Sequence, residues 1–261
     1  MNLKLIYRIN DYKLGGNMKK TLFAILLASA AFTSQASENL TIGTEATYAP
    51  FEFTNDKNEI IGFDIDVINK ICEEINASCK IVNQSFDGLI PSLKTRRIDA
   101  AIAGIDITPE RQKQVDFTKI YYDDSSIQFI TLKDTLTDLE QLKGKRVGIQ
   151  KGTTYFKYLN EKYPDVKPVS YDSYQYAFLD LKAKRIDAIV ASSFVAGDWL
   201  SKETDIVALG DKITDHDFFG EGLGIALRKG NDQLREQFNQ ALDKLKSNGE
   251  LDAIYKKWFN K

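Results

Sequence analysis

The sequence is poor in the residues and motifs on which many enzymes depend. Its 261 residues include one histidine, His216, and two cysteines, too few for a zinc cluster built from histidine and cysteine ligands. It has no G-x-S-x-G, P-loop or H-E-x-x-H motif, which are the usual marks of serine hydrolases, nucleotide hydrolases and zinc proteases. These absences argue against an enzyme, and we expect neither a metal nor a cofactor.

The chain also lacks an apolar run long enough to cross a bilayer, which takes about 20 residues. The run at 22–31 follows two lysines and precedes Ser34-Gln35-Ala36. A basic start, a short apolar run and a small-x-small site indicate a cleaved secretory signal at 18–36, and hence a periplasmic protein. Residues 1–17 fit no part of a signal, and we interpret them as a wrongly assigned extension upstream of Met18.

An excess of positive charge is missing as well. The formal net charge is -2, and removal of residues 1–36 takes away five basic residues and one acid, which leaves -6. An acidic surface does not favour nucleic acid or an anionic membrane as a partner. The two cysteines, Cys72 and Cys79, form a close even pair in a secreted chain, and we expect a disulfide between them.

One sequence occurs almost twice: LKTRRIDAAIAG at 93–104 and LKAKRIDAIVAS at 181–192, identical at seven of twelve positions. The first copy ends a series of alternating predicted strands and helices, with strands at 40–44, 79–84 and 98–104 and helices at 63–77 and 86–97. The second ends a similar series, with strands at 145–150, 166–171 and 186–192 and helices at 153–163 and 173–185. This alternation predicts an α/β fold with two lobes, each a mostly parallel sheet flanked by helices.

The tail, with a strand at 222–230 and helices at 231–249 and 250–259, is too short for a third lobe. We therefore expect it to return to the first lobe, so that the chain crosses between the lobes twice. An alternative explanation of the repeat is convergence, because a helix with a basic end running into a strand is common in α/β proteins.

Polar and aromatic residues follow the predicted strands, where open α/β sheets bind ligands. They are Glu45, Tyr48, Phe86, Asp106, Arg111, Gly152, Thr154 and Ser192. Arg111 suits a carboxylate, the helix start at Thr154 also favours an anion, and the acids suit a cation. An amino acid, including a basic one, fits this description because it has a carboxylate at one end and a cation at the other. Each residue also has a purely structural alternative, such as a surface acid, a core aromatic or a salt bridge.

The sequence resembles the periplasmic solute-binding proteins of family 3 that serve ABC transporters for polar amino acids, especially the lysine/arginine/ornithine and arginine-specific ones. The matching stretches include GTEATYAPFEF, IGFDIDVINKIC, GIDITPERQKQVDFT and GELDAIYKKWF. The resemblance implies a type II periplasmic-binding-protein fold with two hinge strands. It predicts lobe 1 at 38–123 plus 221–261 and lobe 2 at 124–220, and a monomer that delivers its ligand to a permease in the inner membrane.

The resemblance also implies roles for single residues. Tyr48 and Phe86 would sandwich the ligand side chain, and Glu45 would face its cationic end. Arg111, Thr154 and the backbone near Gly152 would hold the α-carboxylate. Gly104 and Asp106 would meet the α-ammonium. The set of expected ligand-binding residues is completed by Ala103, Gln150 and Ser192.

One position departs from the family pattern, which has aspartate where this chain has Ser192. A neutral hydroxyl gives up a charge pair with the ammonium, a loss of about 1–3 kcal/mol if nothing compensates. We expect arginine as the ligand, with Asp106 taking over the ammonium. The alternatives are a neutral amino acid such as glutamine, a molecule without an ammonium, and an enzyme like the dehydratases that share this fold.

Overall fold

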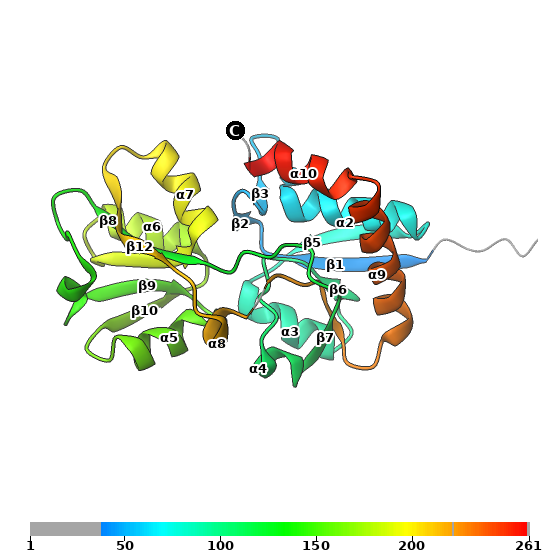
Figure 1. Cartoon of the computed structure of the whole chain (residues 1–261), viewed down its shortest axis with the longest axis horizontal. Coiled ribbons are helices and arrows are strands. Elements are labelled where there is room, and N and C mark those ends of the chain that lie inside the picture. Colours follow the sequence, from blue (N-terminus) through cyan, green and yellow to red (C-terminus); the bar gives the residue numbers. More distant parts are fainter. Residues whose placement is uncertain (1–37, 221, 260–261) are drawn as a thin grey trace, which may run out of the picture. The chain divides into compact units, whose positions relative to one another are not determined.

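The computed structural model describes residues 38–220 and 222–259, which form one compact unit built on two five-stranded sheets (Figure 1). The predicted signal at 18–36 and the extension at 1–17 lie outside the described residues. The first sheet has the strand order β5 (Ser78–Asn83), β1 (Asn39–Thr44), β6 (Ala100–Ala101), β13 (Ala226–Arg228), β7 (Val115–Phe117). The second has the order β10 (Lys167–Tyr171), β9 (Arg146–Gln150), β11 (Ala188–Ser192), β8 (Ile127–Leu132), β12 (Ile206–Ile213).

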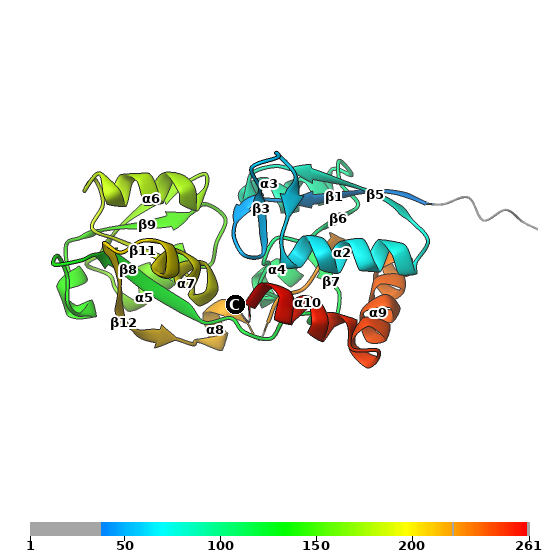
Figure 2. The ribbon, with the colours of Figure 1, turned by 90° about the horizontal axis from the view of Figure 1, so that it is seen from above.

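Helices flank both sheets. With the first sheet lie α2 (Phe63–Glu74), α3 (Phe86–Lys94), α4 (Pro109–Gln112), α9 (Asp232–Ser247) and α10 (Glu250–Phe259). Figures 1 and 2 show α2 and α10 on one side of this sheet and α3 on the other. With the second lie the 3-10 turn η2 (Leu139–Leu142), α5 (Tyr155–Lys162), α6 (Tyr174–Lys182), α7 (Ser193–Lys202) and α8 (His216–Phe219). A small third sheet joins β2 (Thr47–Tyr48), β3 (Glu52–Thr54) and β4 (Ile60–Ile61).

The two-lobed α/β fold is confirmed, but the sheets are mixed. Strand β1 runs parallel to β5 and β6, and β9 runs parallel to β10 and β11. The antiparallel pairs are those that β13 makes with β6 and β7, and those that β8 makes with β11 and β12. Each of these four pairs contains β13 or β8. These two strands follow the segments that cross between the sheets, and each enters its sheet from the end opposite to that of its neighbours. The tail strand β13 joins the first sheet, as expected.

The repeated sequence forms the same object in both sheets. Asp99 accepts a hydrogen bond from the Thr41 N–H at 2.8 Å, and Asp187 accepts one from the Arg146 N–H at 2.8 Å. Each aspartate therefore fixes the start of the neighbouring parallel strand, β1 in one sheet and β9 in the other. The repeat thus has a structural role in the sheets, in addition to ending at the predicted ligand site.

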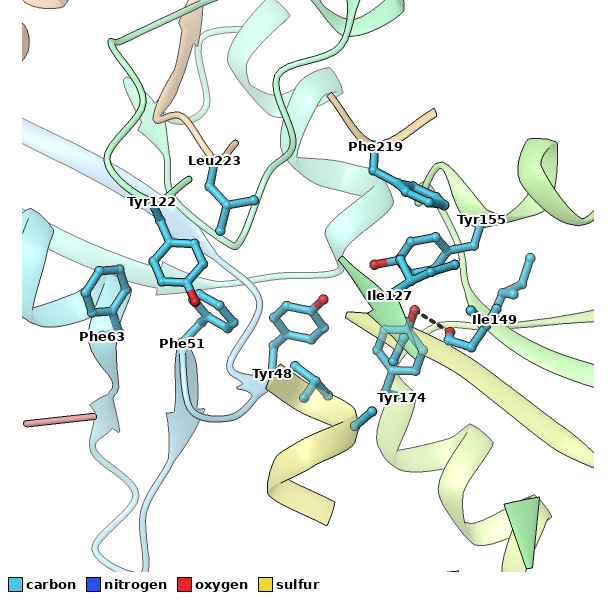
Figure 3. Close-up of a cluster of buried hydrophobic side chains, with 14 of the residues drawn as sticks. Tyr48, Phe51, Phe63, Tyr122, Ile127, Ile149, Tyr155, Tyr174, Phe219 and Leu223 are labelled. Carbon is cyan, nitrogen blue, oxygen red and sulfur yellow. Dashed lines mark hydrogen bonds between the residues drawn. The ribbon is translucent and has the colours of Figure 1, made fainter. Parts of the chain in front are cut away.

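The two segments that cross between the sheets hydrogen-bond to each other. Leu223 donates its N–H to the Tyr122 carbonyl at 2.7 Å, and Tyr121 donates to the Leu223 carbonyl at 3.0 Å. Around them aromatic rings pack from both sheets, among them Phe51 and Tyr122 at 5.4 Å between centroids (Figure 3). Phe194 of α7 joins this cluster at 5.4 Å from Tyr122. Among the described residues, no helix is long and apolar enough to span a membrane.

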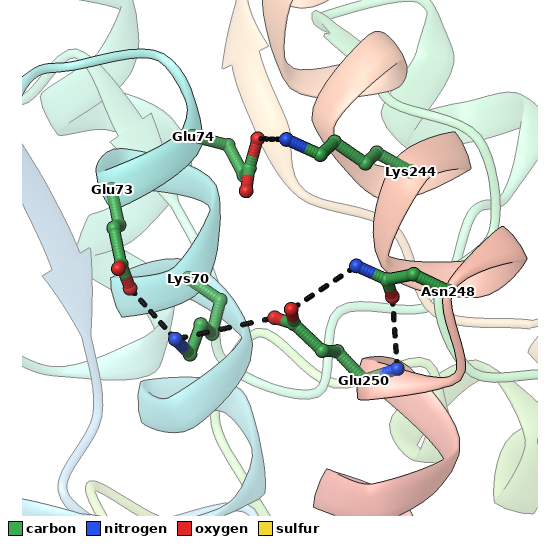
Figure 4. A network of polar contacts seen from close by, with 6 residues as sticks. All are labelled: Lys70, Glu73, Glu74, Lys244, Asn248 and Glu250. Atoms are coloured by element: carbon green, nitrogen blue, oxygen red, sulfur yellow. Dashed lines mark hydrogen bonds and ion pairs between the residues drawn. The ribbon is translucent and has the colours of Figure 1, made fainter.

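Polar contacts at the surface join α2 to the two C-terminal helices (Figure 4). Lys244 of α9 pairs with Glu74 at 2.5 Å, and Lys70 pairs with Glu73 at 2.7 Å and reaches Glu250 of α10 at 4.0 Å. Exposed pairs of this kind contribute about 0–1 kcal/mol each. The buried side chains between these helices, such as Phe238 and Leu242, therefore hold the tail more strongly than its charges do.

The predicted disulfide between Cys72 and Cys79 is confirmed, with a separation of seven residues along the chain. It joins the last turn of α2 to strand β5. We expect the double variant Cys72→Ser/Cys79→Ser to lose about 2 kcal/mol of stability, because closing a loop of this length restricts the unfolded chain by about that amount. Urea unfolding of the variant, of the oxidised protein and of the reduced protein measures the loss. Equal midpoints for the variant and the oxidised protein would contradict the expectation.

Candidate functional site

Gly104 lies just beyond the end of β6, the central strand of the first sheet. Its φ of 55° belongs to the left-handed region, and a Cβ added there would come within 3.0 Å of Cε1 of Tyr48. Only glycine meets both demands without strain. The Gly104 N–H donates to Oδ2 of Asp64 at 2.8 Å. The backbone at the strand mouth is thus fixed by a carboxylate behind it and approached closely by an aromatic ring.

Arg111 reaches from the first lobe to the second. It lies in the short helix α4, which Pro109 begins and Thr108 caps by accepting the Arg111 N–H at 3.3 Å. Its guanidinium donates through Nη1 to the Asp106 carbonyl at 2.9 Å and through Nη2 to the Gly152 carbonyl at 3.1 Å. The Asp106 carboxylate is 3.6 Å from Nη1. Two backbone carbonyls therefore aim a buried, permanently charged group at the space between the lobes.

The surroundings of Arg111 suit an anion. Its Cζ lies 5.5 Å from the centroid of the Phe86 ring, a distance at which the ring attracts the cation. The hydroxyl of Thr154, just before α5, is buried and has no hydrogen-bond partner among the described residues. A Cβ on Gly152 would lie 2.9 Å from Cα of Asp87, so the two lobes approach closely here. A carboxylate beside Arg111 would accept from the guanidinium and from this free hydroxyl.

Glu45 follows β1 and is buried, with 5% of its surface exposed. Thr47 donates its hydroxyl to Oε1 of Glu45 at 2.6 Å. Burial raises the pKa of Glu45, and contacts with the Thr47 and Gln150 side chains oppose this rise. Gln150 ends strand β9 of the other lobe. Among the residues that the structure describes, no Lys or Arg acts on this carboxyl, and a cationic ligand placed beside it would stabilise its ionised form.

Tyr48 is the aromatic centre of the site (Figure 3). Its ring stacks on Tyr174 with centroids 5.8 Å apart and an interplanar angle of 26°. Burial raises the pKa of Tyr48, and the hydroxyls of Ser192 and Tyr155 act on its own hydroxyl. Tyr174 is fully buried and donates its hydroxyl to the Val190 carbonyl at 3.0 Å. Tyr48 of the first lobe thus meets three polar or aromatic residues of the second.

An open cavity of about 800 Å³ lies between the lobes and is lined by four of the predicted residues: Phe86, Arg111, Gly152 and Thr154. The other predicted residues do not line it. Gly104 and Ser192 lie against Tyr48, Glu45 and Gln150 contact each other, and Asp106 contacts Arg111. The side chain of Ala103 packs in the hydrophobic core, which leaves only its backbone for a ligand.

The sequence argument missed several residues of this site. Tyr155 follows Thr154 directly, and Tyr174 comes three residues after β10 ends. Both follow strands, as Glu45 does. Asp64 lies in the first turn of α2, where the helix dipole by itself favours an acid. Its contact with Gly104, 40 residues away, leaves no local pattern in the sequence.

Two α/β lobes, joined by two crossing segments and with polar residues at the facing strand ends, define a class of protein that captures small solutes between lobes. The chain belongs to the family of bacterial extracellular solute-binding proteins, family 3, whose model matches residues 40–261.

Its relatives include the ABC transporter arginine-binding protein 1 of Escherichia coli K12. The two are 48% identical over 242 residues, which cover 93% of this chain and 99% of the relative. Among solved structures, it is similar to a Salmonella typhimurium periplasmic binding protein studied for high arginine specificity. That match has a TM-score of 0.83 and 45% identity, and covers 85% of this chain and 100% of the other. An ancestral arginine-binding protein bound to glutamine matches with a TM-score of 0.79 and 38% identity, and covers 85% and 98% of the two chains.

Asp106 titrates near neutral pH in this site. Burial raises its pKa to about 7, against the opposing effect of Arg111. Because the folded pKa lies above the ordinary value, Asp106 costs stability as the pH rises from about 4 through about 7. We therefore measure the free energy of unfolding of Asp106→Asn minus that of the wild type, and expect this difference to be larger at about pH 8 than at about pH 5.

The matched control for this experiment is Asp116→Asn. Burial raises the pKa of Asp116, but the N–H of Gly230 and the ammonium of Lys229 outweigh it and lower that pKa. Because Asp116 is then ionised in both the folded and the unfolded protein above about pH 5, the stability difference between the control and the wild type should stay constant over the same rise in pH. A pH-independent difference between Asp106→Asn and the wild type would contradict the assignment.

Proposed function

We propose that this protein is the periplasmic arginine-binding component of an ABC transporter, which delivers its ligand to a permease in the inner membrane. The proposal rests on two groups of opposite charge. Arg111 lies beside the Thr154 hydroxyl, which has no hydrogen-bond partner among the described residues, and Glu45 lies elsewhere in the site without a basic partner among them. Arginine supplies a carboxylate to the first and a guanidinium to the second. The names of its relatives support the same ligand.

We propose further that residues 38–123 with 221–261 form one lobe, that 124–220 form the other, and that the two close on the ligand as a monomer. In this arrangement Tyr48 faces the ligand's aliphatic stem, and Gly104 and Asp106 receive its α-ammonium. The contacts of Arg111 with Gly152, and of Glu45 with Gln150, are the ones that closure would make and opening would break.

Isothermal titration with arginine, lysine, ornithine, histidine and glutamine tests the ligand. We expect arginine to bind most tightly, and Glu45→Gln to weaken arginine by about tenfold or more while changing glutamine little, because only arginine brings a cation to this carboxylate. Glu236→Gln, on the exposed face of α9, removes the same charge at the surface and should leave both affinities unchanged. Tighter binding of glutamine than of arginine by the wild type would end the arginine proposal.

A second candidate ligand is glutamine. Ser192 favours it because the site holds one negative charge fewer than an aspartate here would give, and so suits a ligand of lower net charge. The Ser192 hydroxyl is neutral. It accepts the Val195 N–H at 3.4 Å and contacts the Tyr48 hydroxyl. We expect Ser192→Asp to tighten arginine binding about tenfold if this position faces the ammonium. Titration of the variant decides, and an unchanged affinity would show that Ser192 faces another part of the ligand.

A further inference from the structure

Two acidic side chains are buried together behind Gly104. Glu52, in strand β3, and Asp64, in the first turn of α2, have no exposed surface. The Asp64 N–H donates to the carbonyl of Phe51 at 2.9 Å, which holds the start of α2 against the residue before Glu52. The carboxyl of Asp64 is the strongest neighbouring charge acting on Glu52. Ionising both groups side by side without solvent would be very costly.

The partners of the two carboxyls differ sharply. Asp64 accepts the Gly104 N–H at 2.8 Å, and the Tyr121 hydroxyl lies 3.0 and 2.9 Å from its two oxygens. Donors of this kind stabilise a carboxylate. Neither oxygen of Glu52 meets any N–H or O–H donor among the described residues. An ionised Glu52 would only accept hydrogen bonds and would be left with none, whereas a protonated Glu52 has one O–H to give.

Basic side chains do not compensate this pair. The groups that act on the two carboxyls are Glu45 for Glu52, the Gly104 N–H and Tyr121 for Asp64, and each carboxyl for the other. Asp106 lies near enough to act on Tyr121 and Tyr48, and it too is acidic. Burial raises the pKa of Glu52 well above its ordinary range, and that of Asp64 to about 6. These directions, and the lack of any donor to the Glu52 oxygens among the described residues, favour a pair that keeps one proton, on the Glu52 side.

We propose that Glu52 is a positioning residue of the binding site: as a neutral carboxylic acid it keeps its proton, donates an O–H hydrogen bond to the Asp64 carboxylate, and so holds that single anion in place for the Gly104 N–H. The ligand then meets a rigid Gly104 backbone with a negative charge behind it. This charge favours a cation in front of Gly104, where Ser192 supplies none. Glu52 acts only through Asp64 and needs no contact with the ligand.

The proton on Glu52 is tested in the protein without ligand. Infrared spectroscopy near pH 7, with glutamate carbon-13 labelling, should show the band of one buried, protonated glutamic acid that Glu52→Gln removes. A spectrum without this band, or with a band unchanged in the variant, would overturn the proposal. The result does not depend on arginine binding, so a wild type that shows the band and binds no arginine would contradict only the function proposed above.

The positioning role is tested by titration with arginine, and this part rests on the proposed function. Glutamine can replace the O–H donor with N–H, so Glu52→Gln should bind arginine within roughly threefold of the wild type, and Glu52→Ala about tenfold or more weakly, a difference worth about 1.4 kcal/mol. Circular dichroism and the Tm establish that both variants fold. Equal losses in the two variants, or a folded Glu52→Ala that binds like the wild type, would overturn the role.

A pH series separates positioning from a merely structural role. As Glu52 ionises at alkaline pH, it loses its donor and repels Asp64, whereas glutamine does not titrate. The ratio of the wild-type Kd to the Glu52→Gln Kd should therefore rise with pH, and in this ratio the titration of the ligand itself cancels. A ratio that rises only between about pH 4 and pH 5, the ordinary range of a glutamic acid, and stays constant above it would contradict a proton on Glu52 at neutral pH.

Discussion

The hydrogen bond from the Gly104 N–H to Asp64 joins the mouth of β6 to the first turn of α2. Most of the site is placed relative to this bond. Tyr48 can approach only because Gly104 has no side chain, and Asp106 and the Arg111 helix follow within seven residues along the chain. A shift of the Gly104 backbone would therefore disturb the placement of Tyr48, Asp106 and Arg111 together.

Burial is what gives the few charges of this site their effect. Glu45, Glu52, Asp64 and Asp106 all lie in or behind the cleft, and burial is the largest influence on the pKa of each. A low-dielectric cleft strengthens every interaction with a ligand charge, but it also penalises each carboxylate that finds no partner. The protein meets this penalty with hydroxyl and backbone N–H donors and, in our proposal, with one retained proton.

The sequence predicts the lobes well because their pattern is local. The repeat at 93–104 and 181–192, and the alternation of apolar runs with helical spacing, need no knowledge of distant contacts. The mixed character of the sheets was not predicted. Strand β8 pairs with both β11 and β12 across long stretches of chain, and nothing in the residues of these strands gives the direction of pairing.

In the candidate site too, some residues could be inferred from the sequence and others could not. Arg111 and Thr154 stand at helix starts with clear capping signals, so their place at the strand ends could be inferred from the sequence. The partners of Gly104 and Tyr48 could not. Asp64 and Tyr174 come from helices far along the chain, and their roles arise from burial, which a single sequence does not reveal for a polar residue.

The difference between the two copies of the repeat now has a physical consequence. Each copy ends at the carboxyl end of a central strand. The Gly104 N–H donates to the Asp64 carboxylate, whereas the Ser192 hydroxyl accepts the Val195 N–H and contacts the Tyr48 hydroxyl. The negative charge that an α-ammonium requires therefore lies entirely on the first lobe. In the site proposed above, the first lobe would therefore hold the ammonium, and the second lobe would contribute Gln150, Thr154 and its tyrosines, which would contact the side chain and the carboxylate of the ligand instead of this positive charge.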